Sequence, residues 1–239
     1  MKIRSSSSLS LLLVWSLFPA AVTAEVALRP FNANYDLHRG NSHIGNTELV
    51  LERRGNRWRW RSLTKAQGVY AWFTRKQPYT ETSFSPADSE FLLNEILISD
   101  ARKKSNYELA SFDWNKSQLE VFRKGKHRQL RLEAKAYDYQ SIHLLAAIMV
   151  QQRQVERRID FYRKGKLVKS RMTYMGRQIL DLDGKNMDVN VYEQVISKSK
   201  STIKYYYDAA NPLLPLRIEK LEPRKKPSVL TLRRIDWGL

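Results

Sequence analysis

The sequence has no cysteine among its 239 residues. This absence excludes disulfide bonds, metal sites built on thiolates, and a lipid anchor on a cysteine of the kind that bacterial lipoproteins carry. A chain of this length can bury a hydrophobic core large enough to fold without cross-links.

Long apolar segments are also absent beyond the first residues. At the N-terminus, Lys2 and Arg4 precede an apolar stretch over residues 9–18, and Val22 and Ala24 follow at the spacing that a signal peptidase accepts. The stretch is shorter than the about 20 residues that a transmembrane helix needs. The pattern predicts a signal peptide over residues 1–24, with an uncleaved anchor as the alternative, and one domain over residues 25–239. We therefore expect a periplasmic protein of a Gram-negative cell, with no transmembrane helix in the mature chain.

Acidic residues are few: the chain has 24 Asp and Glu against 42 Lys and Arg, which gives a net charge of +18. Many basic residues form short runs at expected turns. The runs include Arg102-Lys103-Lys104, Arg123-Lys124-Gly125-Lys126, Arg163-Lys164-Gly165-Lys166 and Arg224-Lys225-Lys226. A single run is explained equally well by a solvated hairpin tip, but the total should attract polyanions. Because nucleic acid is not expected outside the inner membrane, the expected partners are anionic lipid, lipopolysaccharide or acidic glycan.

Helical periodicity is rare, and apolar residues instead alternate with polar ones, as Phe31, Ala33, Tyr35 and Leu37 do. Such alternation is typical of half-buried strands. Together with the turns between them, it predicts strands over 31–37, 44–51, 57–61, 91–98, 105–114, 117–122, 128–133, 158–163, 168–175, 178–182, 187–197, 202–207, 216–222 and 229–237.

One segment, residues 139–152, predicts a helix, with Ile142, Leu145, Ala146 and Met149 on one face and Asp138 as its N-cap. A weaker helical or loop segment covers residues 68–76. So many strands in series must curl to hide their edges. The sequence therefore predicts a mainly β fold, a strongly curved antiparallel sheet or partly open β-barrel, whose helix covers an open side or an end. A closed barrel and a two-sheet sandwich are the alternatives.

Residues that could carry chemistry are sparse. Asp138, Ser141 and His143 suggest a catalytic triad, but on a helix His143 would point away from the face that the other two share. His38 and His43 could meet across a hairpin, yet a metal site needs a third ligand. No phosphate-binding glycine loop is present. We predict no catalytic residue, no metal site and no cofactor.

Aromatic and basic residues of three segments are the candidates for ligand binding. They are Trp58, Trp60, Trp72, Arg57, Arg59, Arg61, Tyr205 and Tyr207. In a strand, Trp58 and Trp60 point to one face and the three arginines to the other. In one interpretation the aromatic residues form the core and the arginines the surface. In the other, the aromatic side chains line a curved groove and the arginines surround it, to bind an anionic amphiphile.

Several short motifs extend in order over almost the whole mature chain. They are the alternating Phe31, Ala33, Tyr35 and Leu37; Ile44-Gly45; Gly68; Phe112-Asp113-Trp114; Asp138 with Ser141; Tyr205 with Tyr207; and the stretch from Pro212 to Glu219. In this order the chain resembles the DUF-3108 domain family of exported Gram-negative proteins. The resemblance implies a periplasmic antiparallel β protein, with no established activity or catalytic residues to carry over. The closing stretch is also similar to that of envelope half-barrels that shuttle or sense amphipathic ligands, a similarity of fold.

The sequence leaves three functions open. The first is non-enzymatic binding of an anionic amphiphilic or glycan ligand of the envelope. The second is a protein-interaction or scaffolding module of an envelope assembly, which would use its charge for steering. The third is an enzyme acting on a glycan or the cell wall. An open apolar concavity would favour the first, a filled barrel the second, and a polar cleft with two carboxylates in register the third.

Overall fold

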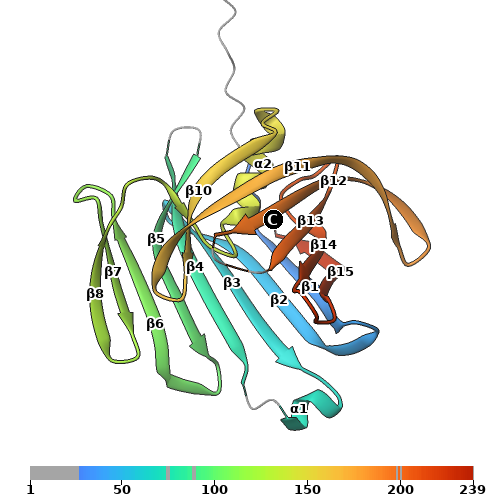
Figure 1. Ribbon diagram of the computed structural model, residues 1–239, viewed down its shortest axis with the longest axis horizontal. Coiled ribbons are helices and arrows are strands. Elements are labelled where there is room, and N and C mark those ends of the chain that lie inside the picture. The colour runs from blue at the N-terminus through green and yellow to red at the C-terminus, as the bar shows by residue number, and fades with distance from the viewer. Residues whose placement is uncertain (1–26, 74–75, 88–89, 198, 200, 239) are drawn as a thin grey trace, which may run out of the picture.

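The computed structural model describes residues 27–239 except 74–75, 88–89, 198, 200 and 239. The predicted signal peptide over residues 1–24 lies outside this range. In the described part, one sheet of 15 strands curls around a helix (Figure 1). The sheet does not close into a hydrogen-bonded barrel, so the predicted mainly β fold with a strongly curved, partly open sheet is confirmed.

The elements follow one another along the chain with short turns between most of them. They are β1 (Phe31–Arg39), β2 (Ser42–Arg54), β3 (Arg57–Ala66), α1 (Val69–Phe73), β4 (Pro78–Ala87), β5 (Glu90–Asp100), β6 (Lys103–Asp113), β7 (Gln118–Arg123), β8 (Lys126–Arg131), β9 (Ala136–Tyr137), α2 (Ile142–Gln151), β10 (Glu156–Arg163), β11 (Lys166–Leu182), β12 (Lys185–Ile196), β13 (Thr202–Asp208), β14 (Pro215–Leu221) and β15 (Ser228–Trp237).

Three features of the sheet differ from the sequence prediction. Strand β4 was not predicted, because polar residues occupy both of its faces. The segments 168–175 and 178–182 form one strand, β11, whose bulge at Gly176 shifts the register with β12. Gly176 has φ +100, a conformation that favours glycine. The two-residue strand β9 pairs with β10 in parallel, while the other pairs are antiparallel.

The order of the strands brings the two ends of the described chain together in the middle of the sheet. Strand β1 pairs with β15 from Phe31 opposite Trp237 to Arg39 opposite Ser228. The two edges of the sheet are β8 and β9, which are consecutive along the chain and joined by residues 132–135 only. Because such a link spans at most about 17 Å, the edges must lie near each other.

The two edge regions overlap through side chains. At the β10–β11 turn, the Gly165 amide (2.9 Å) and the Tyr162 hydroxyl (2.8 Å) donate hydrogen bonds to Oε1 of Glu108 on β6, which also pairs with Arg123 of β7. Near β9, Glu90 pairs with Arg157 and Lys135. Two buried or half-buried carboxylates therefore hold the curled sheet together where strand hydrogen bonds are missing.

Helix α2 lies inside the curled sheet (Figure 1). Every residue from Ile142 to Met149 is buried, so the helix buries another side in addition to the predicted apolar face. The predicted face, Ile142, Leu145, Ala146 and Met149, packs on a cluster from β10–β13. Of the other buried positions, Leu144, Ala147 and Ile148 pack on a second cluster contributed mainly by β1–β7.

The helix also begins later than predicted. It starts at Ile142 instead of residue 139, and Ser141, not Asp138, is the residue before its first turn. The Asp138 carboxylate accepts hydrogen bonds from the amides of Gln140 (3.2 Å) and Ser141 (2.8 Å), which fixes a separate turn ahead of the helix. Helix α1 lies within the segment 68–76, for which a weaker helix or a loop was predicted. No helix in the described ranges is long and apolar enough to cross a membrane.

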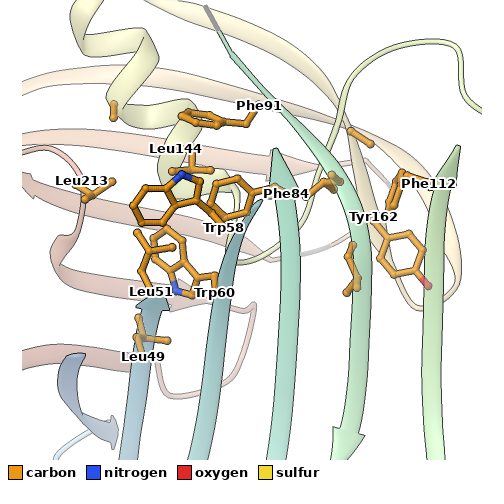
Figure 2. Close-up of a cluster of buried hydrophobic side chains, with 14 of the residues drawn as sticks. Leu49, Leu51, Trp58, Trp60, Phe84, Phe91, Phe112, Leu144, Tyr162 and Leu213 are labelled. Carbon is orange, nitrogen blue, oxygen red and sulfur yellow. The ribbon is translucent and has the colours of Figure 1, made fainter. Parts of the chain in front are cut away.

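One end of the curled sheet is filled by side chains, many of them aromatic, and Figure 2 shows some of these packed beside α2. Phe31 and Trp60 meet edge to face with their ring centroids 5.4 Å apart, and Phe84 and Phe91 do so at 5.5 Å. We call this the closed end. The opposite end, where the turns after β1, β5 and β7 and helix α1 lie, is the open end (Figure 1).

Candidate ligand cavity at the open end

A cavity of about 620 Å³ lies inside the sheet between the closed-end cluster and the open end. Inward-facing residues of β1–β7, β10 and β13–β15 line it, together with the turn before α2. The cavity exists because the inward positions towards the open end carry smaller side chains than the aromatic residues of the closed end.

One wall of the cavity is rich in hydroxyl groups. Thr47, Thr64, Ser62 and Thr80 face inward from β2, β3 and β4. Ser62 lies opposite Thr80 in the sheet register, and the Thr47 and Thr64 hydroxyl oxygens are 2.9 Å apart. This wall can donate hydrogen bonds to a ligand or accept them from it.

The facing wall is apolar. Leu37, Leu230 and Ile218 lie side by side across β1, β15 and β14, and Ile203 of β13 extends this surface. The cavity is therefore amphipathic, although Leu49 of β2 and Ile98 of β5 add aliphatic carbon beside the hydroxyl groups and Ser228 of β15 adds a hydroxyl beside the apolar wall.

The floor, next to α2, contains two buried polar atoms without a partner. Trp60 is fully buried and Gln140 is 4% exposed, and both line the cavity. Within the described part of the chain, neither the Trp60 indole Nε1 nor the Gln140 Oε1 has a hydrogen-bond partner. In Figure 2, the Trp60 nitrogen lies on the side of the ring away from Leu144 and Phe91. A buried donor and a buried acceptor therefore lie beside the cavity without a protein partner, each covered by neighbouring atoms that must shift before a ligand can reach it.

His143 also belongs to the floor, and burial lowers the pKa of its imidazole to about 3, so that it is neutral at ordinary pH. Its Nδ1 lies 2.9 Å from the Tyr207 hydroxyl. The Ser141 hydroxyl donates to Asp138 at 2.7 Å, and the Thr82 hydroxyl donates to the same carboxylate at 2.5 Å. Ser141 therefore bonds to the carboxylate and not to the imidazole, which is not the order of a nucleophile and its base.

Basic side chains surround the mouth of the cavity. Arg163, Lys164 and Lys220 contribute to its lining, as does Arg123. Arg123 pairs with Glu108, and Lys220 lies 2.7 Å from Glu222. Arg163 and Lys164 have no carboxylate partner among the residues that the structure describes, so their charge is available to an anion.

The structure brings together only some of the residues predicted to bind a ligand. Trp60 and Tyr205 line the cavity, and Tyr207 is buried behind His143. Burial raises the pKa of the Tyr205 hydroxyl well above its usual value, so it stays neutral, and it donates to Gln194 at 2.7 Å. Trp58 is 8% exposed and belongs to the closed-end cluster.

The predicted arginines lie on the other side of the sheet from the cavity. Arg59 pairs with Glu81 at 3.2 Å and Arg61 with Glu52 at 3.2 Å, while Arg57 is exposed at the start of β3. The structure describes the backbone of Trp72, which belongs to α1, but not its side chain. The binding role predicted for Trp72 therefore stays a prediction. His38 and His43 do meet across the β1–β2 turn, with their ring centroids 5.0 Å apart. The described residues contain no group of three or more metal-ligating side chains.

Sequence reasoning missed the hydroxyl wall. Its members are polar residues at inward positions, so the parts of the strands that carry them lack the apolar residues by which a buried face is recognised. The signal that could have found it is the alternation of side chains along each strand. In β2 and β3, Thr47 and Ser62 continue the series of inward positions that Leu49, Leu51, Trp58 and Trp60 occupy.

Comparisons with known proteins support the fold alone. No protein-family model and no curated protein matches the chain. Among solved structures, it is similar to a "Beta-barrel-like Protein of Domain of Unknown Function DUF1849 from Brucella abortus", with a TM-score of 0.58 and 11% sequence identity. The alignment covers 89% of this chain and 99% of the other, so the similarity extends over most of both chains.

Proposed function

We propose that the chain binds one small anionic amphiphile in the cavity and does not transform it chemically. The observation that carries the proposal is the pair of unpartnered atoms on the floor, Trp60 Nε1 and Gln140 Oε1. A buried donor or acceptor without a partner costs about 1–3 kcal/mol. A ligand that satisfies both atoms removes this cost, and the cavity volume of about 620 Å³ is within the usual range for small-molecule sites.

The walls suggest how the ligand lies. A neutral hydrogen-bonding group, such as an amide, an ester or a hydroxyl, reaches the floor beside Trp60 and Gln140. An aliphatic part covers Leu37, Leu230 and Ile218. An anionic group remains at the mouth, near Arg163 and Lys164, because a charge deeper in the cavity would lose its hydration without gaining a cation.

The proposed place of action comes from the sequence. The signal-peptide pattern of residues 1–24 supports export to the periplasm, and the ordered motifs support kinship with the DUF-3108 family. The anions of that compartment are lipid headgroups, lipopolysaccharide and acidic glycans. An amphiphile derived from these molecules fits the cavity better than a purely polar glycan, because one wall is aliphatic.

Native mass spectrometry of the protein purified from its host, with lipid extraction, tests the proposal. We expect a stoichiometric anionic adduct. Ser62→Phe should abolish the adduct because Ser62 lines the cavity, while Ser83→Phe, on the outward face of β4, should leave it intact. A clean apo mass for the folded wild-type protein would contradict the proposal.

A second candidate is docking to another envelope protein, and the β11–β12 hairpin favours it. The two strands continue to the pair Leu182–Lys185, beyond the last pair of β12 with β13 at Val189–Asp208. On this extension Ile179 is 68% exposed, and Met175 beside the bulge is 48% exposed. A protein that co-purifies with the wild type and is lost from Ile179→Lys, together with an apo mass, would favour this function over ligand binding.

A further inference from the structure

We propose that the open end docks on an anionic lipid surface, so that the mouth of the cavity faces the membrane. The proposal goes beyond ligand binding and does not depend on it, because it rests on the loops around the mouth and not on the cavity itself.

The loops at the open end carry a ring of exposed basic residues. The turns after β1, β5, β7, β10 and β14 and the segment around α1 contribute to it. Its exposed members are Arg39, Lys76, Arg102, Lys103, Lys124, Lys126, Lys164, Lys166, Arg224, Lys225 and Lys226. In the same described loops the exposed or half-buried carboxylates are Asp100 and Glu222, so the ring has a large positive excess.

The closed end also carries exposed arginines, among them Arg53, Arg57, Arg131 and Arg153, but carboxylates accompany its basic residues. There Lys116 pairs with Asp113 at 3.2 Å and Arg54 with Glu52 at 3.1 Å, and Glu156 pairs with Arg158 and Arg171. Solubility alone would not require the two ends to differ. The asymmetry therefore points to a partner that meets the open end.

Apolar side chains are exposed at the same end. On α1, which projects from the open end in Figure 1, Val69 is 70% and Tyr70 is 40% exposed. On the outward face close by, Tyr79 and Leu97 form an apolar groove with Tyr107, which is 37% exposed. A basic surface with a few exposed aromatic and aliphatic side chains has the two signals that hold a protein on a bilayer surface, electrostatic attraction and shallow insertion.

The spacing of the charges favours a lipid surface over an acidic protein. The basic residues are distributed over separate loop tips around a wide ring and are not gathered in one groove. Lipid headgroups diffuse laterally and can meet such a ring, whereas a folded partner would need carboxylates fixed at matching positions. Each Lys or Arg near an anionic surface contributes about 1 kcal/mol, which corresponds to about a fivefold change in partition coefficient.

Vesicle flotation of the protein, as its host processes it, tests the docking. The probes are vesicles of phosphatidylcholine alone and vesicles with about a third of phosphatidylglycerol, at low and at physiological salt. The open-end variant combines Arg102→Gln, Lys103→Gln, Lys124→Gln and Lys126→Gln. The matched control combines Arg53→Gln, Arg57→Gln, Arg131→Gln and Arg153→Gln, exposed positions towards the closed end that remove the same charge.

We expect flotation with the anionic vesicles only, weakened by salt, and a loss of roughly a hundredfold or more in partition coefficient for the open-end variant. The control should lose less than about fivefold, because its arginines lie away from the membrane. Val69→Ser with Tyr70→Ser should weaken flotation without changing its dependence on salt. Equal losses for the two charge variants, flotation with neutral vesicles, or binding only to an acidic protein would overturn the proposal. Adduct retention in the Ser62→Phe experiment is measured without vesicles, so the two proposals can fail separately.

Discussion

Lowering the pH from 7.5 to 5 should destabilise the protein through one side chain, His143. Its imidazole is 3% exposed between Trp60, Tyr205 and Tyr207, and burial lowers its pKa from 6.5 to about 3. Between these values the unfolded chain binds a proton that the folded protein does not. The stability that the neutral imidazole provides is therefore fully present above pH 6.5. Below that pH the free energy of unfolding falls by about 1.4 kcal/mol for each pH unit between 6.5 and 3. The expected loss at pH 5 is about 2 kcal/mol.

The pH window isolates this residue from the carboxylates. For Glu90, burial raises the pKa, but the hydrogen bonds and charges of Arg157 and Lys135 outweigh it, so the net pKa is lowered. Hydrogen bonds from Lys220 and Lys225 lower the pKa of Glu222 to about 2. The stability that these carboxylates provide is lost only as the pH falls below about 4.5, outside the measured range.

Urea unfolding followed by circular dichroism at pH 5, 6, 7 and 8 measures the effect. His143→Gln retains a polar group beside Tyr207 but cannot be protonated, so its stability should be nearly independent of pH from 5 to 7. His127→Gln, at a side chain that is 61% exposed, should behave like the wild type. A wild-type stability that does not change between pH 5 and 7, or an unchanged slope in His143→Gln, would refute the reasoning.

Two substitutions test the floor of the cavity and the overlap of the sheet edges. Trp60→Phe removes the unpartnered indole N–H, which recovers about 1–3 kcal/mol and offsets much of the about 2 kcal/mol lost with the ring volume. Its urea midpoint should thus change little while the fraction carrying the co-purified adduct falls in native mass spectra. Trp58→Phe should lower the midpoint and keep the adduct, and a fully loaded Trp60→Phe protein would contradict this assignment. Glu108→Ala leaves the Gly165 amide and the Tyr162 hydroxyl without an acceptor, so we expect a loss of about 2–4 kcal/mol and faster hydrogen exchange at Gly165. The control Glu120→Ala, whose side chain is 53% exposed, should change neither quantity.

The sequence predicted most strands because one of their faces is apolar. In β1, inward Phe31, Ala33 and Tyr35 alternate with half-buried polar residues, and this period-two pattern needs no knowledge of the rest of the molecule. It failed at β4, where the inward positions Thr80 and Thr82 are polar and Pro78 and Pro86 lie near the ends. Strand β4, which was not predicted, thus lines the cavity through Thr80.

The helix shows a second limit of local patterns. Its position was predicted from Ile142, Leu145, Ala146 and Met149, but Leu144, Ala147 and Ile148 are also buried. An apolar residue on the opposite side of a helix has the same sequence signature whether it packs on a second wall or faces water. Likewise, the alternation of Trp58 and Trp60 with the arginines predicted two faces. Only the curl of the whole sheet decides that the arginines lie outside and that Trp60 reaches the cavity.

The pairing of β1 with β15 has a consequence for how the chain acquires its structure. The register Phe31 opposite Trp237 joins residues that are almost the whole chain apart, and this pair connects the two halves of the sheet. Contacts of such high sequence separation are entropically costly to form and slow folding. While the chain is still emerging from a ribosome or a membrane pore, the edge of β1 that pairs with β15 stays unpaired until the last residues appear. Over that interval the exposed edge can pair wrongly with other strands, so the fold is one for which the order and speed of chain delivery matter.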